Sequence, residues 1–293
     1  REEFIPHLYY FFQISVIFVK MNRILLLIAV LFAANPLLPQ STQPGIAEDS
    51  LFLLFEQFQT MGTVEEKQAL NASILDYMES CLVLPESFEY RFDSLSKRVG
   101  ILKAEDMQFR VFTWNIPMGP FTHEYHGIVQ VNDQHENTCR VHVLSDRNIP
   151  DLLQTETGKD MWPGALYYDL RRNKHGNEVI YTLMGFNFHD RYSDKKIIEV
   201  LHFDNDMNPL FGKPVFNTPS GIQYRVVFEY SGDVAMNLRY NPYMKMIVYD
   251  HLSPIEPELR DHPRFYAPDF SYDGYKFKRG IWEYQADLDV RNR

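Results

Sequence analysis

The chain is poor in cysteine and lacks the short motifs that usually mark an active site. It has two cysteines in 293 residues, too few for a multi-bridge framework or a cysteine-rich zinc site. The patterns G-x-S-x-G, G-x-G-x-x-G, G-x-x-x-x-G-K-[ST] and C-x-x-C are all absent. These absences argue against the common serine-hydrolase, dinucleotide-binding, P-loop and thiol-redox classes. They favour a noncatalytic protein without a cofactor.

Basic residues are also scarce. The chain has 29 lysines and arginines against 39 aspartates and glutamates, which gives a formal net charge of −10 at pH 7. No block of basic residues interrupts this balance. Such a chain would approach nucleic-acid phosphates against its own electric field. We therefore exclude nucleic acid as a partner.

The most apolar part of the chain lies near its N-terminus. Asn22 and Arg23 precede the apolar run of residues 24–34, and the small residues Gly45 and Ala47 follow. This order is typical of a secretory signal peptide. We predict a signal peptide over residues 21–47, cleaved after Ala47 or at an alternative position near Ala34 or Ser41.

Residues 1–20 precede the internal methionine, and we interpret them as upstream translation outside the protein proper. An alternative joins residues 8–38 into one membrane anchor, but Lys20, Asn22 and Arg23 interrupt that run with polar groups that are costly in hydrocarbon. We expect membrane contact only through the signal segment before cleavage. The predicted location is the periplasm or the outer envelope.

The region of residues 48–100 has the spacing of helices. Leu51, Leu54, Phe55 and Phe58 fall at i, i+3, i+4 and i+7, the apolar stripe of an amphipathic helix. Thr63 followed by Glu66 is a capping box that predicts the start of a second helix, which we expect to end at Pro85. The first part of the mature chain is therefore predicted to be helical.

Residues 101–293 change to a period of two. Short runs rich in β-branched and aromatic residues, such as residues 109–114, 125–131 and 179–186, alternate with turns marked by Gly, Asn and Pro. Residues 197–201 fit either a helix or a strand. Because the connections are short, neighbouring strands should pair antiparallel. The sequence predicts a mainly β (α+β) protein, with an antiparallel meandering sheet, sandwich or barrel-like, after an N-terminal helical segment.

Several stretches of the β region resemble one protein family. They are Phe109 to Asn115 (FRVFTWN), Tyr181 to Asn187 (YTLMGFN), Lys195 to Leu201 (KKIIEVL), Met246 to Pro254 (MIVYDHLSP), Phe265 to Phe277 (FYAPDFSYDGYKF) and Trp282 to Asn292. From about residue 100 onwards the chain is similar to an uncharacterised family of exported envelope proteins from Gram-negative bacteria. The resemblance implies an envelope location and a single unit over the last two thirds of the chain, and it implies no catalytic role.

Two short segments approach metal-binding patterns. His123 and His126 flank Glu124 and Tyr125, one residue short of the zinc-protease spacing. On a strand, residues three apart point to opposite faces, so these histidines should not share an ion. Residues 204–208 imitate the first half of a calcium loop, but Pro209 stands where Gly is needed, which favours a solvated turn. We predict no metal site.

The segment from Tyr249 to Tyr275 is the most concentrated polar and aromatic part of the chain. We interpret it as a long loop stiffened by prolines, a kind of segment that often carries function. The candidate functional residues are Trp114, Asp250, His251, Tyr266, Asp269, Tyr272 and Asp273. Two of these carboxylates could form an acid/base pair. The alternative is that Asp250 and Asp269 hydrogen-bond to the backbone and that Asp273 lies in a turn.

Exposed rings offer a second functional hypothesis, with Trp114, Tyr266, Tyr272 and Tyr275 as the predicted solvent-facing aromatics. Three functions follow. The first is an exported noncatalytic envelope protein that binds or scaffolds an envelope protein partner; the alternatives are a glycan-binding module and a hydrolase that uses acidic residues of the loop. Cys81 and Cys139 either form a disulfide or are separately buried thiols.

Overall fold

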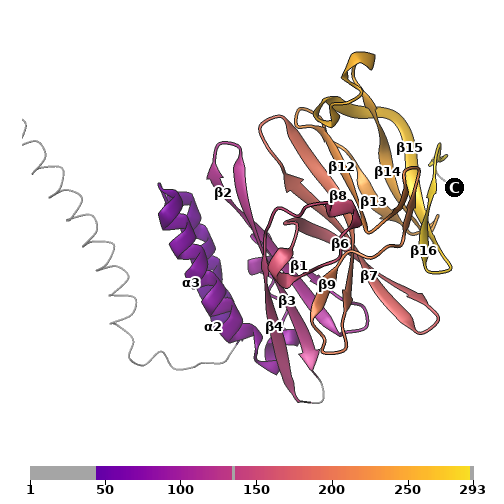
Figure 1. Cartoon of the computed structure of the whole chain (residues 1–293). Coiled ribbons are helices and arrows are strands. Elements are labelled where there is room, and N and C mark those ends of the chain that lie inside the picture. Colours follow the sequence, from indigo (N-terminus) through magenta and orange to yellow (C-terminus); the bar gives the residue numbers. More distant parts are fainter. Residues whose placement is uncertain (1–43, 134–135, 291–293) are drawn as a thin grey trace, which may run out of the picture. The chain divides into compact units, whose positions relative to one another are not determined.

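A computed structural model describes residues 44–133 and 136–290 (Figure 1). Within these residues the chain is mainly β, with antiparallel sheets that follow an N-terminal helical segment, and the strands form no closed barrel. This confirms the predicted fold class. Most of the predicted signal peptide, and all of residues 1–20, lie outside the described residues. The final residues of that prediction, Gly45 to Ala47, belong to the first described helix.

The helical segment matches the predicted pattern closely. Its helices are α2 (Pro44–Gln57), α3 (Val64–Leu82) and α4 (Pro85–Glu89), with the short 3-10 turns η1 (Phe58–Thr60) and η2 (Leu95–Lys97). Four further 3-10 turns lie in the β region: η3 (Leu152–Gln154), η4 (Lys159–Met161), η5 (Pro257–Leu259) and η6 (Pro263–Phe265). The predicted capping box is present, because the Thr63 hydroxyl accepts from the Glu66 amide while the Glu66 carboxylate accepts from the Thr63 amide. α3 ends at Leu82 and not at Pro85, which begins α4, a position where proline is favoured.

The first sheet is a four-stranded meander. It contains, in order, β1 (Gly100–Lys103), β2 (Phe109–Gly119), β3 (Thr122–Asp133) and β4 (Thr138–Ser145). Each strand pairs antiparallel with the next along the chain. Short hairpin connections produce this order, as the sequence predicted.

The second sheet has the order β5-β9-β8-β7-β6, and β12 pairs with β8 outside that path. Its strands are β5 (Thr157–Gly158), β6 (Leu166–His175), β7 (Glu178–Phe188), β8 (Ser193–Phe203), β9 (Pro209–Phe211) and β12 (Arg225–Ser231). The ambiguous residues 197–201 lie in β8, a strand paired on both edges.

The third sheet has the order β11-β10-β16-β15-β14-β13. Its strands are β10 (Phe216–Thr218), β11 (Gly221–Gln223), β13 (Leu238–Asn241), β14 (Met246–Pro254), β15 (Tyr266–Lys278) and β16 (Ile281–Gln285). Unlike the predicted all-antiparallel meander, this sheet contains one parallel pair, β10 with β16. The two strands lie far apart in the sequence, so a long crossover is available for parallel pairing.

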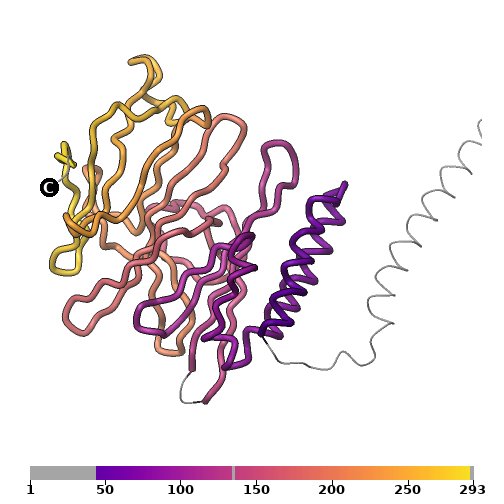
Figure 2. Tube along the Cα trace, turned by 180° about the vertical axis from the view of Figure 1, so that it is seen from behind, coloured from indigo at the N-terminus to yellow at the C-terminus, as the bar shows by residue number. Residues whose placement is uncertain are grey.

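The elements pack in layers, with α2 and α3 on one face of the first sheet and the other two sheets following (Figures 1 and 2). β2 shows why. Phe112 and Trp114 belong to the core under the helices, whereas Phe109 and Val111 belong to the core shared with the second sheet. Because successive strand residues face opposite sides, both faces of this strand are buried. A third core joins the second and third sheets.

A buried ion pair stands inside the second sheet. Nε of Arg225 lies 2.5 Å from Oε1 of Glu199, and both side chains are fully buried. Oε2 of Glu199 accepts from the Tyr167 hydroxyl at 2.7 Å, and the Arg225 guanidinium also donates to backbone carbonyls. At Gly212, with φ +86°, a Cβ would meet Nη2 of Arg225 at 2.5 Å. Glycine at this position therefore leaves room for the guanidinium.

A second buried arginine ties the helical segment to the first sheet. Arg110 donates to Oε1 of Gln130 at 2.7 and 2.9 Å and to the carbonyls of Ser87 and Tyr90, both at 2.7 Å. Its guanidinium also lies 5.3 Å from the Phe88 ring centroid. Burial lowers the pKa of Arg110 to about 10. The charge is satisfied by carbonyl oxygens and rings, which makes Arg110 a structural residue.

Candidate functional site

The predicted loop of residues 249–275 is largely a β-hairpin. β14 continues to Pro254 and β15 begins at Tyr266, so the irregular connection covers only residues 255–265. The prediction of one long loop was wrong. Pro254 ends a strand and Pro268 lies beside a shift in the strand register, positions at which strands tolerate proline.

His251 and Asp273, two of the predicted residues, lie together on this hairpin. His251 lies in the β-bulge between β14 and β15, and its Nδ1 is 2.7 Å from Oδ2 of Asp273. The buried Asp273 carboxylate also accepts from the Tyr284 hydroxyl at 2.7 Å and the Asp287 amide at 3.1 Å. The hydrogen bond with Asp273 raises the pKa of His251, against the opposing effect of burial. Asp273 lies in a strand and not in the predicted turn.

The other two predicted carboxylates are held by nearby donors. Burial raises the pKa of Asp269, but hydrogen bonds from Ser271 and Ser253 outweigh this effect. The pKa of Asp269 therefore lies below its ordinary value. Asp250 is buried and accepts from the amide and the side chain of Asn237 at 2.7 and 3.0 Å. These contacts agree with local structural roles.

An acid/base pair needs one carboxyl group that keeps its proton near neutral pH. Asp269 has the opposite shift, and its Oδ2 is 4.0 Å from Nε2 of His251. Within the described residues no serine or cysteine is hydrogen-bonded to Nε2 of His251. Asp269 is therefore poorly suited to act as the proton-donating carboxyl group of such a pair.

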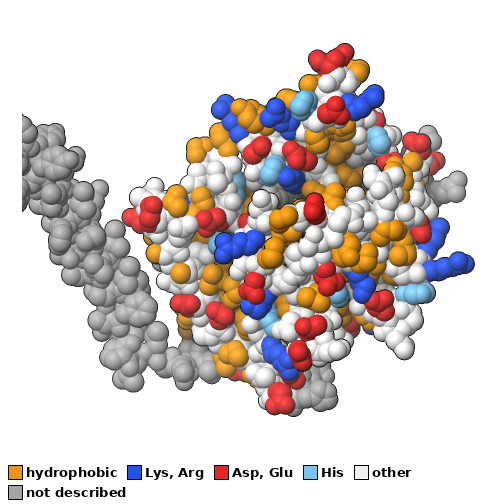
Figure 3. Space-filling model, in the orientation of Figure 1, with side chains coloured by type: hydrophobic (Ala, Val, Ile, Leu, Met, Phe, Trp, Pro, Cys, Tyr) orange, Lys and Arg blue, Asp and Glu red, His pale blue; other side chains and the backbone are white. Residues whose placement is uncertain are grey.

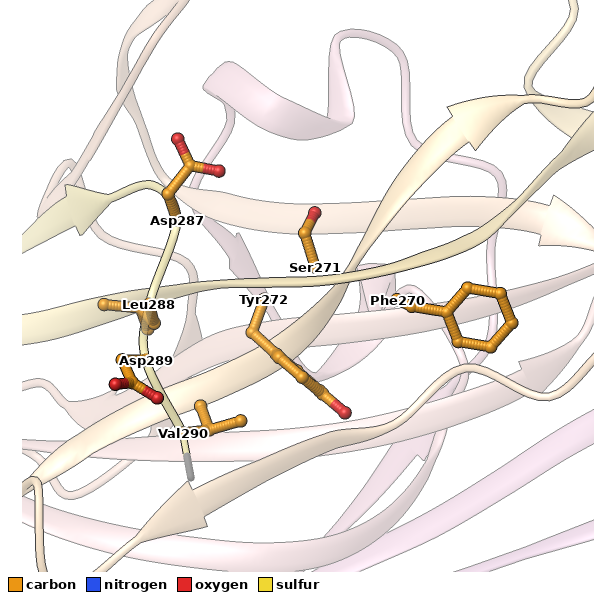
Figure 4. A pocket seen from close by; sticks show the side chains of 7 residues that line it. All are labelled: Phe270, Ser271, Tyr272, Asp287, Leu288, Asp289 and Val290. Carbon is orange, nitrogen blue, oxygen red and sulfur yellow. The ribbon is translucent and has the colours of Figure 1, made fainter. Parts of the chain in front are cut away.

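A cavity of about 410 Å³ lies between β15 and the segment of residues 287–290. Tyr272, another predicted residue, lines it together with Phe270 and Asp287. In Figure 4 the side chains of Asp287 and Ser271 point to one side of the strand, whereas Tyr272 points to the other and Phe270 points away from the C-terminal segment. The lining side chains diverge, so they do not form one polar constellation.

The predicted exposed aromatics are mostly covered. Trp114 is 1% exposed, donates to Oδ1 of Asn71 at 2.9 Å and stacks on His126. Tyr275 is also buried, while Tyr266 and Tyr272 are half-buried. The prediction of exposure was wrong for Trp114 and Tyr275, because the helices cover Trp114 and the second sheet covers Tyr275.

Exposed rings gather instead where the β2–β3 hairpin meets the β7–β8 hairpin. The two hairpin ends lie side by side in both views (Figures 1 and 2). Phe121, Phe188 and Tyr192 there are 51%, 41% and 56% exposed. We call this region the hairpin surface, defined by Phe121, His123, Phe186, Phe188, Arg191, Tyr192, Arg264 and Phe265.

One row of the hairpin surface is a continuous stack of side chains. His123 stacks on Phe188 with ring centroids 4.8 Å apart, and Phe188 meets Phe186 edge-on at 4.6 Å. Nζ of Lys196 then lies 5.1 Å from the Phe186 centroid. These contacts hold rings from two different sheets in one row.

A second row alternates rings with guanidinium groups. Arg191 lies over Phe121 at 5.4 Å and over Tyr192 at 5.7 Å. Arg264 lies over Tyr192 at 5.8 Å and over Phe265 at 5.0 Å. These distances are within the range of cation–π attraction. In Figure 3, basic, histidine and acidic side chains are interspersed with hydrophobic ones along the upper edge of the molecule.

No sequence pattern predicted the hairpin surface. Its only local signal is the placement of aromatic residues at turns, such as Phe121 directly after Gly119 and Pro120. A turn residue is exposed by default, so an aromatic there is worth noting. That Arg191 and Arg264 both reach Tyr192 depends on the packing of segments about 70 residues apart in the sequence.

The two segments that approach metal-binding patterns, residues 123–126 and 204–208, make ring contacts and hydrogen bonds with the protein itself. His123 stacks on Phe188, whereas His126 accepts from or donates to Asn71 beneath α3, so the two imidazoles point to opposite faces of β3. Both carboxylate oxygens of Asp204 are used within the turn by Asp206 and Asn208. Across residues 44–133 and 136–290 no group of three potential ligands is placed to hold a metal.

The two cysteines are free thiols in the structure, Cys139 buried and Cys81 half-buried. Of the two alternatives, a disulfide or separately buried thiols, the structure has separate thiols, with Cys81 only partly buried. The backbone amide of Cys139 donates to the carbonyl of Val83 at 3.1 Å, which joins the end of α3 to β4. Burial raises the pKa of both thiols, so neither is an activated nucleophile.

Among the helices of the described residues, none has the length and apolarity needed to cross a membrane. Comparisons of the chain with protein-family models, curated proteins and solved structures give no match. The resemblance to exported envelope proteins stays a prediction.

Proposed function

We propose that this chain is a noncatalytic envelope protein that binds a glycan through the hairpin surface. The observation that carries this proposal is the gathering of Phe121, Phe188 and Tyr192, all exposed, at the ends of two hairpins from different sheets. An exposed ring presents a flat apolar face on which the C–H face of a sugar can stack. The neighbouring arginine and histidine groups can donate hydrogen bonds to sugar hydroxyls.

A protein-docking role for the helices has weaker support. The exposed large apolar residues of the helical segment are Ile46, Leu53, Val64 and Val83. Val64 begins α3 and Val83 follows its end, so about 27 Å of helix separates them. Ile46 and Leu53 lie two turns apart on α2. These side chains do not form the contiguous apolar patch that marks a stable protein interface.

A hydrolase role has weaker support still. The carboxylates of Asp250, Asp269 and Asp273 are all occupied by structural hydrogen bonds. Asp269, which lies 4.0 Å from Nε2 of His251, has a lowered pKa, which opposes a role as proton donor. We therefore do not assign an enzymatic activity.

Export remains part of the proposal, with the cleavage position moved upstream. Ala47 is buried within α2, and the next residue, Glu48, accepts from the Tyr90 hydroxyl and the amides of Ser94 and Leu95. A cut after Ala47 would remove the first turn of the helix that carries Glu48. Cleavage near Ala34 or Ser41 leaves α2 whole. N-terminal sequencing of the protein recovered from an envelope fraction would identify the cut, and a start at Glu48 would contradict the upstream position.

The binding proposal is tested with the purified protein on an oligosaccharide array, followed by calorimetric titration of the best ligand. Tyr192→Ala and Phe121→Ala should each weaken binding about tenfold, which is about 1.4 kcal/mol. Tyr243→Ala is the matched control, because Tyr243 is 87% exposed and lies in the β13–β14 turn outside the hairpin surface. Equal losses in Tyr192→Ala and Tyr243→Ala, or no binding to any oligosaccharide, would contradict the proposal.

A further inference from the structure

Two guanidinium groups converge on one exposed ring of the hairpin surface. Arg191 comes from the β7–β8 turn and Arg264 from η6, yet both lie within 6 Å of the Tyr192 ring centroid, at 5.7 and 5.8 Å. Each is also placed by a second ring, Phe121 for Arg191 and Phe265 for Arg264. Ring contacts thus place both guanidiniums before any ligand arrives.

Neither guanidinium is neutralised by the described part of the chain. Arg191 and Arg264 form no ion pair there, whereas Arg98, Arg140 and Arg172 do. The nearest carboxylate in the sequence, Asp190, accepts instead from the amides of Tyr192 and Ser193.

A further carboxylate near the β7–β8 turn, that of Glu229, is also held by other groups. Lys195 lies 3.5 Å from Glu229 and 2.9 Å from the His189 ring nitrogen, so Glu229 already has a basic partner. Lys196 lies over the rings of Tyr168 and Phe186. In a chain with ten more acidic than basic residues, two guanidiniums that share one exposed ring and form no ion pair in the described part of the chain indicate a site for an anion.

We infer that the hairpin surface binds an anionic glycan, with carboxylate or sulfate groups of the sugar held by the guanidiniums of Arg191 and Arg264. This inference rests on the proposed function and names the class of its ligand. The planar guanidinium fork matches a carboxylate or sulfate oxygen pair, while the sugar ring packs on the exposed rings beside it. The acidic group selects the ligand, and the aromatic rings supply the contact area.

A nucleic acid has the same two kinds of group, stacking rings and negative charges, but fits the charge of this protein less well. A nucleic-acid strand carries a charge at every nucleotide and needs a continuous basic track. The hairpin surface offers two guanidiniums in a chain of net charge −10. A glycan with sparse acidic groups suits this arrangement better.

The test uses matched acidic and neutral probes. Binding is measured for a galacturonate hexamer against its methyl ester, for a sulfated dextran oligosaccharide against its unsulfated form, and for a single-stranded oligo-dT. We expect at least one acidic probe to bind about tenfold more tightly than its neutral partner. We also expect that preference to weaken with added salt.

Variants separate the charge from the rings. The double variant Arg191→Ala/Arg264→Ala should lose the preference for the acidic probe and keep residual binding to both members of the pair. The double lysine variant should keep part of the preference, because charge stays and the fork geometry is lost. Arg239→Ala is the control, since Arg239 is exposed on β13 and also forms no ion pair in the described part of the chain.

Each outcome has a defined meaning. Equal binding of acidic and neutral glycans would overturn the anionic class and leave the glycan-binding proposal intact. Tightest binding of oligo-dT would overturn both in favour of a nucleic acid, and absence of binding to every glycan would overturn the proposed function. A preference that survives in the double alanine variant, with an unchanged melting temperature, would show that the anion is held elsewhere.

Discussion

The buried arginines and the arginines of the hairpin surface are the same chemical group in opposite surroundings. Arg225 and Arg110 are fully enclosed, and carboxylate, carbonyl or amide oxygens accept from their guanidiniums. Arg191 and Arg264 lie at exposed positions over aromatic rings, with no carboxylate partner in the described chain. The first two hold layers together, whereas the second two keep their donors available.

This contrast gives a physical criterion for separating structural from functional residues in this protein. A buried charge must be saturated with hydrogen bonds, because desolvation without a partner costs several kcal/mol. A surface charge has no such requirement, so an ordered but unpaired one retains its capacity for a ligand. Substitutions in the two regions should therefore affect different measurements, folding stability in the interior and ligand affinity at the surface.

The largest expected effect is in the buried ion pair. Glu199→Ala removes the carboxylate from Arg225 and leaves the guanidinium enclosed without its anion, which should lower the free energy of unfolding by about 3–5 kcal/mol. Urea denaturation measures the change. The control is Asp93→Ala, because the Arg91–Asp93 pair is 83% and 72% exposed and should contribute about 0–1 kcal/mol. Similar losses in both variants would contradict the contrast.

A smaller loss is expected at the junction of the helices and the first sheet. Arg110→Ala removes donors to Gln130 and to the carbonyls of Ser87 and Tyr90, and should destabilise the protein by about 2–3 kcal/mol. Hydrogen exchange should rise in α3 and α4 more than in β14 and β15. Uniform exchange across all elements would show that Arg110 does not act at this junction.

Two histidines should respond to pH in opposite directions. Burial lowers the pKa of His126, an effect that Glu124 partly opposes, so its stability contribution is present above its unfolded pKa and falls as acid protonates it. The hydrogen bond with Asp273 raises the pKa of His251, so its contribution is present below its unfolded pKa and is lost as pH rises through the raised value.

Unfolding curves of two variants check these signs. The destabilisation caused by His251→Gln should be larger at about pH 5.5 than at about pH 9. Relative to wild type, His126→Gln should reduce the loss of stability between about pH 7 and pH 5. The expected differences are under about 1 kcal/mol, since His251 is partly exposed. Matching pH profiles for the two variants would disprove the assignment.

The smallest expected effect on stability is at the hairpin surface. Arg191→Ala should change the free energy of unfolding by less than about 0.5 kcal/mol, as is usual for a surface substitution, while it weakens binding of the acidic glycan. Parallel urea curves and titrations compare the two quantities. A destabilisation as large as that of Arg110→Ala would mean that Arg191 is a structural residue.

Local signals in the sequence predicted the elements of the fold well. The capping box at Thr63 and Glu66 depends on residues three apart, and the strands follow from alternation over a few residues. The same logic failed between residues 249 and 275, where four prolines suggested a loop. Two of those prolines, Pro254 and Pro268, lie at a strand end and beside a bulge, places where a proline does not break pairing.

The candidate site was predicted only in part. His251, Asp269 and Asp273 were named together and do lie near one another, because strand pairing of β14 with β15 joins residues about 20 apart. Trp114 was expected to be exposed and is buried, because α2 and α3 cover a face of β2 that a single strand cannot reveal. The hairpin surface was missed because it joins segments that no local pattern connects.

By itself, the sequence determined the type of most elements, the acidic charge and the absence of common catalytic motifs, since all of these depend on composition or on neighbours a few residues apart. Only the tertiary structure decided which charges are saturated and which rings are exposed. Burial is a property of what packs against a residue, and for Arg225 and Arg191 those neighbours come from distant parts of the chain.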